Sequence, residues 1–501
     1  MWNQRTKLSV ALGYAVFAAC GAEPGARGLD AGARSDAAER SDASPQGPSD
    51  AGFSDAGLSD AGLADAGGTI TSTTPTIRVF SRALSADPWT EATAPFFGDA
   101  LAVRLSGFPP VSEVEVRASS GAYRSKAVFM TGVDGAVDLS QAAPSSGSYS
   151  GVDPDGLLWS MTSAGGPSDR VDFAVAFSAW IAGEVKASIV LTRTYAPPAA
   201  RFERVSDHGL VGFYVAPEGP GPFPGLVIFG GSEGGLGTGQ ILAQYYAGLG
   251  YACLGLAYFG APGLPSTLEN VPLEYFGNAL SWLKARPEVA ANRLGVMGGS
   301  RGGELALLLA AHYPELKAAV ATVPSGVVWG GISLSSTAAV AAWTFGGLPL
   351  PAVPYSGAQP EARTDPEGNV AYADAPVFLA DIAAASAEDL DLATIPVEQS
   401  QAAILMIAGE DDQLWASCTL AEIAWDRLLS QGHVRSHPDG YHCYPGAGHW
   451  ISTPNLPTMN IAETYLPDFG YYLWLGGEPA AAAHAARQAD EEIRQFLARA
   501  L

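Results

Sequence analysis

The strongest constraint on the fold is a change of hydrophobic pattern near residue 200. Beyond it, five continuous apolar runs follow one another, at residues 225–229, 252–257, 294–298, 318–323 and 403–408. Such runs are expected of strands buried on both faces of a parallel sheet. Helical patterns lie between them, at residues 240–249, 272–286, 303–312 and 417–430. The alternation predicts a doubly wound, mostly parallel α/β domain over residues 201–501.

Residues 328–395 interrupt this alternation. The stretch is rich in Gly, Pro and Ala and lies between two of the predicted sheet strands. Because an insertion at this point of such a sheet commonly covers a site, we expect a cap here. A loose surface insertion is the alternative.

A second pattern occupies residues 71–198. Short runs at residues 77–80, 101–105, 113–117, 171–177 and 187–192 mostly alternate apolar and polar side chains, and turn residues separate them. A period of two in short strands predicts an all-β, immunoglobulin-like sandwich of about seven strands. The stretch holds no His or Cys, so we expect no catalytic cluster in it.

The N-terminus has the features of an export signal. Arg5 and Lys7 precede an apolar stretch, residues 8–19, that is too short to span a bilayer, which needs about 20 helical residues. Small residues then lead to Cys20, which resembles a bacterial lipobox whose cysteine becomes lipidated. We therefore expect residues 1–20 to be a signal peptide of the lipoprotein type; an ordinary signal peptide is the alternative.

Residues 21–70 repeat a short Ser-Asp-Ala-Gly unit with almost no large apolar side chains. A segment of this composition cannot bury a core, so we expect a disordered linker between an anchor and the folded part. Together these segments predict an exported protein at the cell envelope, periplasmic or on the cell surface. Apart from the lipid anchor on Cys20, we expect no contact with the membrane.

The strongest chemical motif is Gly298-Gly-Ser300-Arg-Gly302, which follows an apolar run and opens a helical one. This is the context of a G-x-S-x-G nucleophile elbow, in which small residues allow a tight turn and expose the serine hydroxyl. Serine needs a base and an orienting acid. His449, on a glycine-rich loop, is the candidate base, and Asp412, after the run at 403–408, is the candidate acid with Asp411 as the alternative.

The negative charge that develops in acyl transfer needs hydrogen-bond donors. One is expected from the backbone N–H of Arg301, directly after the serine. The other should come from the loop Gly230-Gly-Ser232-Glu233-Gly-Gly235, through the N–H of Ser232 or Glu233. This loop lacks the Gly-Lys-Ser/Thr ending of a phosphate-binding P-loop, so we do not expect it to bind a nucleotide.

The charge balance and the histidine spacing argue against nucleic-acid-binding and metal-dependent proteins. The 51 acidic and 27 basic residues give a net charge of -24, which disfavours nucleic acid as a partner. His433 and His437 have the spacing of helical zinc ligands, but the glutamate of H-E-x-x-H is absent, so we expect neither a metal nor any other cofactor. Cys418 and Cys443 could pair in an oxidising compartment, and spacing alone leaves this open.

Several stretches of the chain, on both sides of the elbow in sequence, resemble the acyl-CoA thioesterase and bile acid-CoA:amino acid N-acyltransferase (BAAT) family. The similarity extends over about residues 72–500, and that family joins an N-terminal β-sandwich to an α/β-hydrolase domain in this order. By this resemblance Ser300, Asp412 and His449 take the triad roles. The matching stretches are residues 156–159, 223–225 with the glycine loop that follows, 273–276, 299–304, 395–398, 409–415 and 444–449.

The resemblance implies a small-molecule acyl thioester or ester as substrate. Family members that transfer acyl groups to amino acids carry Cys as the nucleophile, so Ser300 favours hydrolysis. An exported chain with this negative charge is poorly suited to coenzyme A substrates. The alternatives are an exported carboxylesterase that does not use coenzyme A, an acyl-CoA:amino acid N-acyltransferase, and a non-catalytic surface binding protein.

Overall fold

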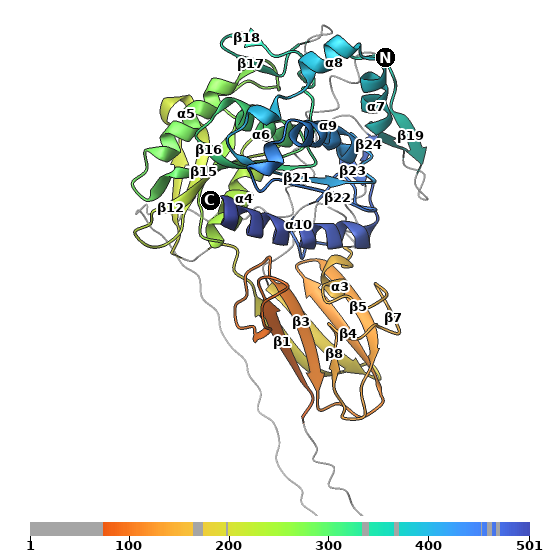
Figure 1. Ribbon diagram of the computed structural model, residues 1–501. Coiled ribbons are helices and arrows are strands. Elements are labelled where there is room, and N and C mark those ends of the chain that lie inside the picture. The colour runs from red at the N-terminus through yellow and green to blue at the C-terminus, as the bar shows by residue number, and fades with distance from the viewer. Residues whose placement is uncertain are drawn as a thin grey trace, which may run out of the picture. The chain divides into compact units, whose positions relative to one another are not determined.

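The computed structural model describes residues 74–163, 174–196, 199–332, 340–364, 370–451, 453–457, 463–466 and 471–501 (Figure 1). The predicted signal peptide, Cys20 and the linker at 21–70 lie outside these residues. Among the described residues, no helix has the length and apolar character needed to cross a membrane.

The first part of the described chain is a β-sandwich. Its two sheets have the orders β2-β1-β3-β6 and β7-β5-β4-β8-β9, and every strand pairing in them is antiparallel. Alternate residues of the long strands enter one shared hydrophobic cluster, as a period of two requires. The elements are β1 (Thr76–Arg82), β2 (Thr90–Glu91), β3 (Ala100–Ser106), β4 (Glu113–Ser120), β5 (Tyr123–Met130), β6 (Val137–Asp138), β7 (Ser146–Gly147), α3 (Gly156–Trp159), β8 (Ala174–Ile181) and β9 (Glu184–Thr192).

The sandwich therefore has more strands than the seven expected. Three of them, β2, β6 and β7, contain only two residues each, too few to give a period-two signal. The long strand β5 was also absent from the predicted runs. Its sequence mixes charged and apolar residues, and only pairing along the whole of β4 shows it to be a strand.

The second part is built on an eight-stranded sheet in the order β10-β11-β13-β12-β15-β16-β21-β22. Pairings from β13 to β22 are parallel, whereas β10 and β11 join antiparallel at one edge. This order confirms the predicted α/β-hydrolase fold. The strands are β10 (Arg201–Val205), β11 (Val211–Ala216), β12 (Phe223–Phe229), β13 (Ala252–Ala257), β15 (Val289–Gly299), β16 (Leu316–Thr322), β21 (Ala403–Gly409) and β22 (Gly440–Tyr444).

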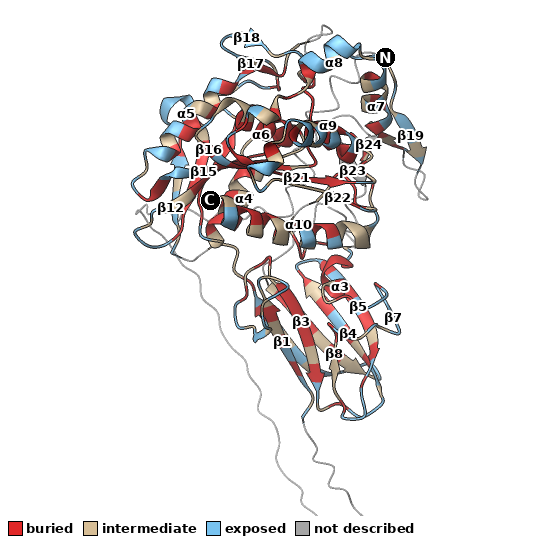
Figure 2. Ribbon diagram, viewed as in Figure 1, coloured by how far each residue is buried: buried red, intermediate tan, exposed pale blue. Residues whose placement is uncertain are grey.

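Helices cover both faces of this sheet. Apolar side chains of α5, α6 and α9 share one core cluster with alternate strand residues, and those of α4 and α10 share a second cluster with the intervening ones. Figure 2 shows buried positions along the central strands between them. The helices are α4 (Gly237–Gly248), α5 (Leu273–Lys284), α6 (Arg301–His312), α9 (Ser417–Ser430) and α10 (Pro479–Ala500), with short 3-10 turns at Asp207–Gly209, Val397–Gln399 and His433–Arg435.

The stretch at 328–395 forms its own small elements. In its described residues, Trp329 and Trp343 are fully buried, and Trp329 belongs to a cluster that also contains Trp415. The stretch is thus packed onto the domain in this region; a covering role over a site stays a prediction. Its elements and their partners are β14 (Val271–Pro272), β17 (Trp343–Phe345), β18 (Leu348–Pro349), β19 (Glu361–Thr364), β20 (Val370–Ala373), α7 (Ala375–Ala384), α8 (Ala387–Ala393), β23 (Glu463–Leu466) and β24 (Tyr471–Trp474).

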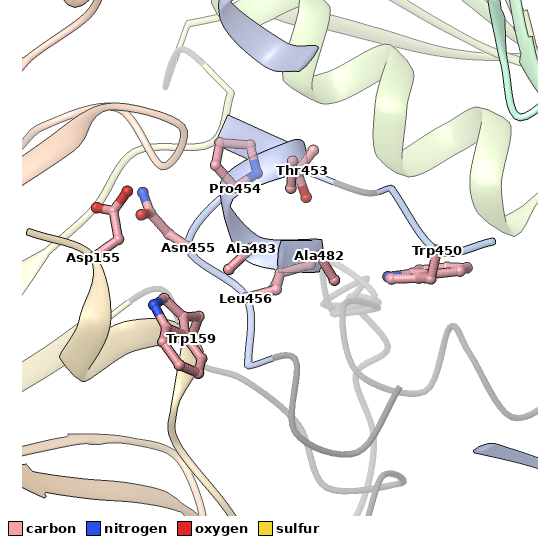
Figure 3. Close-up of a pocket in the computed structure, with 10 residues that line it drawn as sticks. Asp155, Trp159, Trp450, Thr453, Pro454, Asn455, Leu456, Ala482 and Ala483 are labelled. Atoms are coloured by element: carbon pink, nitrogen blue, oxygen red, sulfur yellow. The ribbon is translucent and has the colours of Figure 1, made fainter. Parts of the chain in front are cut away.

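Polar contacts join the sandwich to α10 and to the segment after His449. Arg487 donates to Asp155 at 2.8 Å, and Asn455 donates to the carbonyl oxygens of Phe97 and Asp99 at 2.6 and 2.9 Å. A pocket lies here (Figure 3). It is lined by Asp155, Trp159, Trp450, Thr453, Pro454, Asn455, Leu456, Ala482, Ala483 and Ala486.

Candidate active site

Ser300 occupies the turn between β15 and α6. Its backbone has φ 57° and ψ -122°, a strained conformation for a residue with a side chain. The flanking glycines are required: a Cβ at Gly298 would lie 2.4 Å from the carbonyl oxygen of Gly302, and a Cβ at Gly302 would lie 2.3 Å from that of Gly230. The chain therefore forms the tight strand-turn-helix that the motif predicts.

The neighbouring strand holds this turn in place. The Ser300 N–H donates to the carbonyl oxygen of Thr322, at the end of β16, at 2.9 Å. The Thr322 hydroxyl donates in turn to the carbonyl oxygen of Gly298 at 3.2 Å. A strained backbone persists only where surrounding bonds fix it, and these two bonds fix the chain that enters the serine, from Gly298 to the Ser300 N–H.

His449 and Asp412 form a buried pair. His449 Nδ1 lies 2.8 Å from Asp412 Oδ2, and the two residues are 5% and 2% exposed. The other oxygen, Oδ1, accepts the backbone N–H groups of Leu414 at 2.9 Å and Trp415 at 3.2 Å. An Nδ1–H bond to a carboxylate leaves Nε2 as the basic nitrogen of the imidazole. Within the described residues, His449 Nε2 has no hydrogen-bond partner, so it is free to take a proton.

Asp411 has a different environment from Asp412. Its Oδ1 accepts from Gln413 Nε2 at 2.7 Å, and its Oδ2 accepts the Gly477 N–H at 2.8 Å. Asp411 therefore joins the acid loop to the segment before α10. The geometry brings Asp412, the first choice from the sequence, to the imidazole.

The glycine loop after β12 lies against the elbow. A Cβ at Gly231 would come 3.0 Å from Ser300 Cβ, so only glycine permits this approach. The Tyr258 hydroxyl lies 3.0 Å from the carbonyl oxygens of both Gly230 and Gly231. Because C=O and N–H point in opposite directions across a trans peptide, the Ser232 N–H faces away from Tyr258.

The side chain of Glu233 folds back onto this loop. Its Oε2 accepts the Gly231 N–H at 2.9 Å, and its Oε1 accepts the Thr238 hydroxyl. Burial raises the pKa of the Glu233 carboxyl, while the Thr238 hydroxyl and, more weakly, His449 act to lower it. The Gly231 N–H is thus already occupied, and the N–H groups of Ser232 and Glu233 both stay predicted donors from this loop.

The comparisons with known proteins cover both parts of the chain. The family model described as "BAAT / Acyl-CoA thioester hydrolase C terminal" matches residues 271–501, and "Acyl-CoA thioester hydrolase/BAAT N-terminal region" matches residues 99–207. Human acyl-coenzyme A thioesterase 1 is 31% identical over 416 residues, which cover 79% of this chain and 92% of the relative. The chain belongs to the acyl-CoA thioesterase/BAAT family.

Relatives in this family include both enzyme types that the sequence resemblance implies. Mouse acyl-coenzyme A amino acid N-acyltransferase 1 is 28% identical over 417 residues, covering 79% of this chain and 93% of the relative. Among solved structures, the 2,6-dihydroxy-pseudo-oxynicotine hydrolase aligns with a TM-score of 0.34 and 14% identity, over 62% of this chain and 69% of that one. A dienelactone hydrolase-like phosphotriesterase from metagenomic libraries aligns with a TM-score of 0.34 and 18% identity, over 60% and 98%.

Sequence reasoning missed the role of the Arg301 side chain in this family member. Besides the predicted backbone N–H, which as a first-turn amide has no intrahelical acceptor, Arg301 has a buried guanidinium. This group lies 3.1 Å from Glu304 Oε2 and donates to the carbonyl oxygens of Trp329 and Gly330 at 3.0 and 3.2 Å. The spacing of Arg301 and Glu304 by three helical residues was a usable signal.

Glu304 completes this link between α6 and the insertion. Its Oε1 accepts the indole N–H of Trp343 at 2.7 Å and the backbone N–H of Trp329 at 3.4 Å. Burial raises the pKa of Glu304 to about 7, although Arg301 and the two donors act to lower it. The carboxyl is therefore close to half-ionised at neutral pH.

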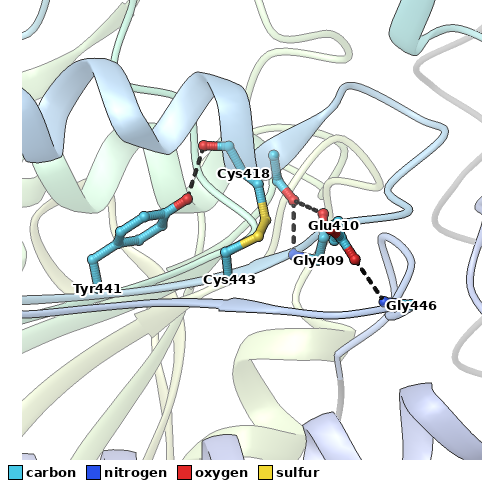
Figure 4. Close-up of a disulfide and its surroundings, with 7 residues drawn as sticks. Gly409, Glu410, Cys418, Tyr441, Cys443 and Gly446 are labelled. Carbon is cyan, nitrogen blue, oxygen red and sulfur yellow. Dashed lines mark hydrogen bonds between the residues drawn. A yellow bond between two sulfur atoms is a disulfide. The ribbon is translucent and has the colours of Figure 1, made fainter.

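The structure joins Cys418 and Cys443 by a disulfide with a Cα–Cα distance of 5.6 Å (Figure 4). Cys418 lies in the first turn of α9, after the acid loop, and Cys443 lies in β22, before the histidine loop. The Tyr441 hydroxyl also donates to the carbonyl oxygen of Cys418 at 3.0 Å. The bridge therefore braces the two segments that carry Asp412 and His449.

His433, one of the two histidines with zinc-like spacing, lies inside the domain and not at its polar surface. It is buried, with Nδ1 2.7 Å from Asp439 Oδ2 and Nε2 3.0 Å from the Ser400 carbonyl oxygen. A histidine with both ring nitrogens bonded can be buried at little cost, which the sequence pattern does not reveal. His437 stacks on it, with 4.1 Å between ring centroids. In the part of the chain that the structure describes, no cluster of three or more His, Cys, Asp or Glu suits a metal ion.

Proposed function

We propose that this protein is a serine-dependent hydrolase of acyl thioesters or esters that works through an acyl-enzyme on Ser300. One observation carries the proposal: a strained elbow serine occurs in the same fold as a buried His449–Asp412 pair whose Nε2 has no hydrogen-bond partner among the described residues. Membership of the acyl-CoA thioesterase/BAAT family supports hydrolysis of a thioester.

In the first half-reaction, His449 Nε2 removes the proton from the Ser300 hydroxyl as its oxygen attacks the acyl carbonyl carbon. Asp412 accepts the Nδ1–H and stabilises the imidazolium that forms. The N–H group of Arg301 and that of Ser232 or Glu233 stabilise the negative oxygen of the tetrahedral intermediate. His449 then gives its proton to the departing thiolate or alkoxide, which leaves Ser300 acylated.

Water completes the cycle by the same route. His449 removes a proton from the water as it attacks the serine ester, and returns a proton to Ser300 as the carboxylic acid leaves. An amine acceptor would have to compete with water for this ester. A serine ester is readily cleared by water when a base is present, so we favour hydrolysis over transfer to an amino acid.

We also propose that the protein is exported and anchored through a lipid on Cys20. The charged start, the apolar stretch and the small residues before Cys20 support this proposal. The Cys418–Cys443 bridge adds support, since disulfides persist mainly in oxidising compartments. Coenzyme A thioesters would be scarce there, and a net charge of -24 opposes a polyanionic leaving group, so an uncharged leaving group fits better.

The test of the chemistry uses the purified full-length chain on matched acyl-CoA and aryl ester series. Ser300→Ala should abolish hydrolysis of both series and labelling by a fluorophosphonate, whereas Ser430→Ala, at the exposed end of α9, should change neither. Hydrolysis that persists in Ser300→Ala would refute the mechanism.

Anchoring is tested separately by metabolic labelling of the expressing cells with an alkynyl fatty acid. The wild-type chain should be labelled and fractionate with membranes, and Cys20→Ala should lose both properties. An unlabelled wild-type chain would reject the lipid anchor and leave the chemistry of Ser300 unaffected.

A further inference from the structure

Trp415 connects the acid, the base and the neighbouring strand. It is buried, and its backbone N–H donates to Asp412 Oδ1 at 3.2 Å. Its ring meets the His449 ring edge to face, with 6.0 Å between centroids and 80° between planes. Its indole N–H donates to the carbonyl oxygen of Val323 at 3.0 Å. The residue therefore contacts Asp412 through its backbone, and its side chain contacts both His449 and a third, separate element.

That third element is the one that holds the nucleophile. Val323 directly follows Thr322, whose carbonyl oxygen accepts the Ser300 N–H at 2.9 Å. Val323 has a positive φ of 39°, and its own N–H bonds to the carbonyl oxygen of Ile407 in the next strand at 2.5 Å. The carbonyl group that receives the indole N–H thus belongs to the residue directly after the one that bonds the elbow, and the N–H of that same residue is held by the next strand.

We propose that Trp415 is a positioning residue that sets the place of the His449–Asp412 pair relative to Ser300. Asp412 holds the imidazole at one nitrogen only, and a single bond leaves the ring free to tilt. The indole ring restrains that tilt, and its N–H bonds the indole to the end of the strand that holds the serine. Because a displacement of about 1 Å can cost up to 10²-fold in rate, such a restraint should be visible in kcat.

The insertion at 328–395 supports Trp415 from another direction. Phe378 of α7 lies between Trp329 and Trp415, with ring centroids 4.7 and 6.0 Å away. These aromatic rings belong to one cluster, which keeps water from the indole and from the Asp412 turn. The insertion therefore contacts His449 indirectly, through the rings of Phe378 and Trp415.

The inference rests on the proposed function of Ser300 and is tested with Trp415→Phe in the full-length chain. Phenylalanine keeps an aromatic ring and removes the indole N–H. We expect kcat on an aryl ester to fall roughly 10- to 100-fold with KM changed by less than about threefold, since ground-state binding is not involved. The fluorophosphonate labelling rate should fall by a similar factor, and the low-field proton resonance of His449 Nδ1–H should shift.

Trp425→Phe is the matched control. Trp425 lies on α9, packs on Tyr441 at 5.9 Å between ring centroids, and contacts no catalytic group by any bond or ring contact found in the described residues. It should lower the thermal midpoint somewhat and leave kcat and the resonance unchanged. If Trp415→Phe gives the same result as this control, Trp415 has a structural role only and the proposal is overturned.

A second substitution at Trp415 and a parallel assay of Ser300→Ala complete the test. If Trp415→Phe does not fold, benzothienylalanine at position 415 replaces only the indole N–H by sulfur; it should still lower kcat about tenfold, and an unchanged kcat would reject the proposal. Ser300→Ala is assayed in parallel. Activity that survives in Ser300→Ala refutes the proposed function, whereas activity lost there but intact in the Trp415 variants refutes only the positioning role.

Discussion

Glu304→Gln tests which of two opposing forces controls the charge of the buried Arg301–Glu304 pair. Burial disfavours the carboxylate, and Arg301 at 3.1 Å with the Trp343 indole favours it. The net pKa of about 7 means that burial prevails. Glutamine keeps an oxygen for the Trp343 N–H and cannot ionise, so the difference between the two proteins isolates the ionisation of Glu304.

The magnitude follows from the two pKa values. Glu304 ionises near its ordinary 4.5 in the unfolded chain and near 7 in the folded one, so between these values the folded state holds one more proton. The stability contributed by the protonated carboxyl is complete below pH 4.5, declines as the pH rises, and is lost above pH 7. At 1.36 kcal/mol per pKa unit, the wild type should lose about 3 kcal/mol relative to Glu304→Gln over this interval.

Urea unfolding of both proteins from pH 4 to pH 8 measures this difference. The free energy of unfolding of Glu304→Gln minus that of the wild type should rise by about 3 kcal/mol between pH 4.5 and 7 and then stay level. Glu218→Gln, at an exposed position, should show no such step. A difference that stays level between pH 4.5 and 7, with any change confined to a lower pH, would mean that Arg301 outweighs burial and would refute the reasoning.

Two further predictions concern the acid loop and the bridge. Asp412→Asn should lower kcat on an aryl ester by roughly 10⁴-fold because the imidazole loses its orienting acceptor, while Asp411→Asn should stay within a few-fold; equal losses would contradict the assignment. Reducing the Cys418–Cys443 bridge should lower the free energy of unfolding by about 3 kcal/mol, since it spans 25 residues. Urea unfolding with and without reductant measures this, and a wild type as insensitive as the Cys418→Ala/Cys443→Ala double variant would show that the bridge does not form.

The elements with strong local patterns could be predicted from the sequence. The apolar runs at 225–229 and 403–408 lie within β12 and β21, because burial on both faces leaves only apolar positions. The elbow at Ser300 also follows from local sequence, since the carbonyl oxygen of Gly302 leaves room only for glycine at position 298, four residues earlier. By contrast, α10 was not among the predicted helices. It is rich in alanine and charge, and its few large apolar residues, such as Ile493 and Phe496, form a face only when set against the sheet.

By itself the sequence determined the residue types for the chemistry and their order along the chain: serine, then acid, then histidine. Tertiary structure decided which acid meets His449, where the Arg301 side chain goes, and that Trp415 joins the base to the strand behind the nucleophile. The physical reason is that strand and turn formation depend on neighbours in sequence. The contacts that orient Asp412, Arg301 and Trp415 are made across segments separated by tens of residues, and only the packed sheet brings these together.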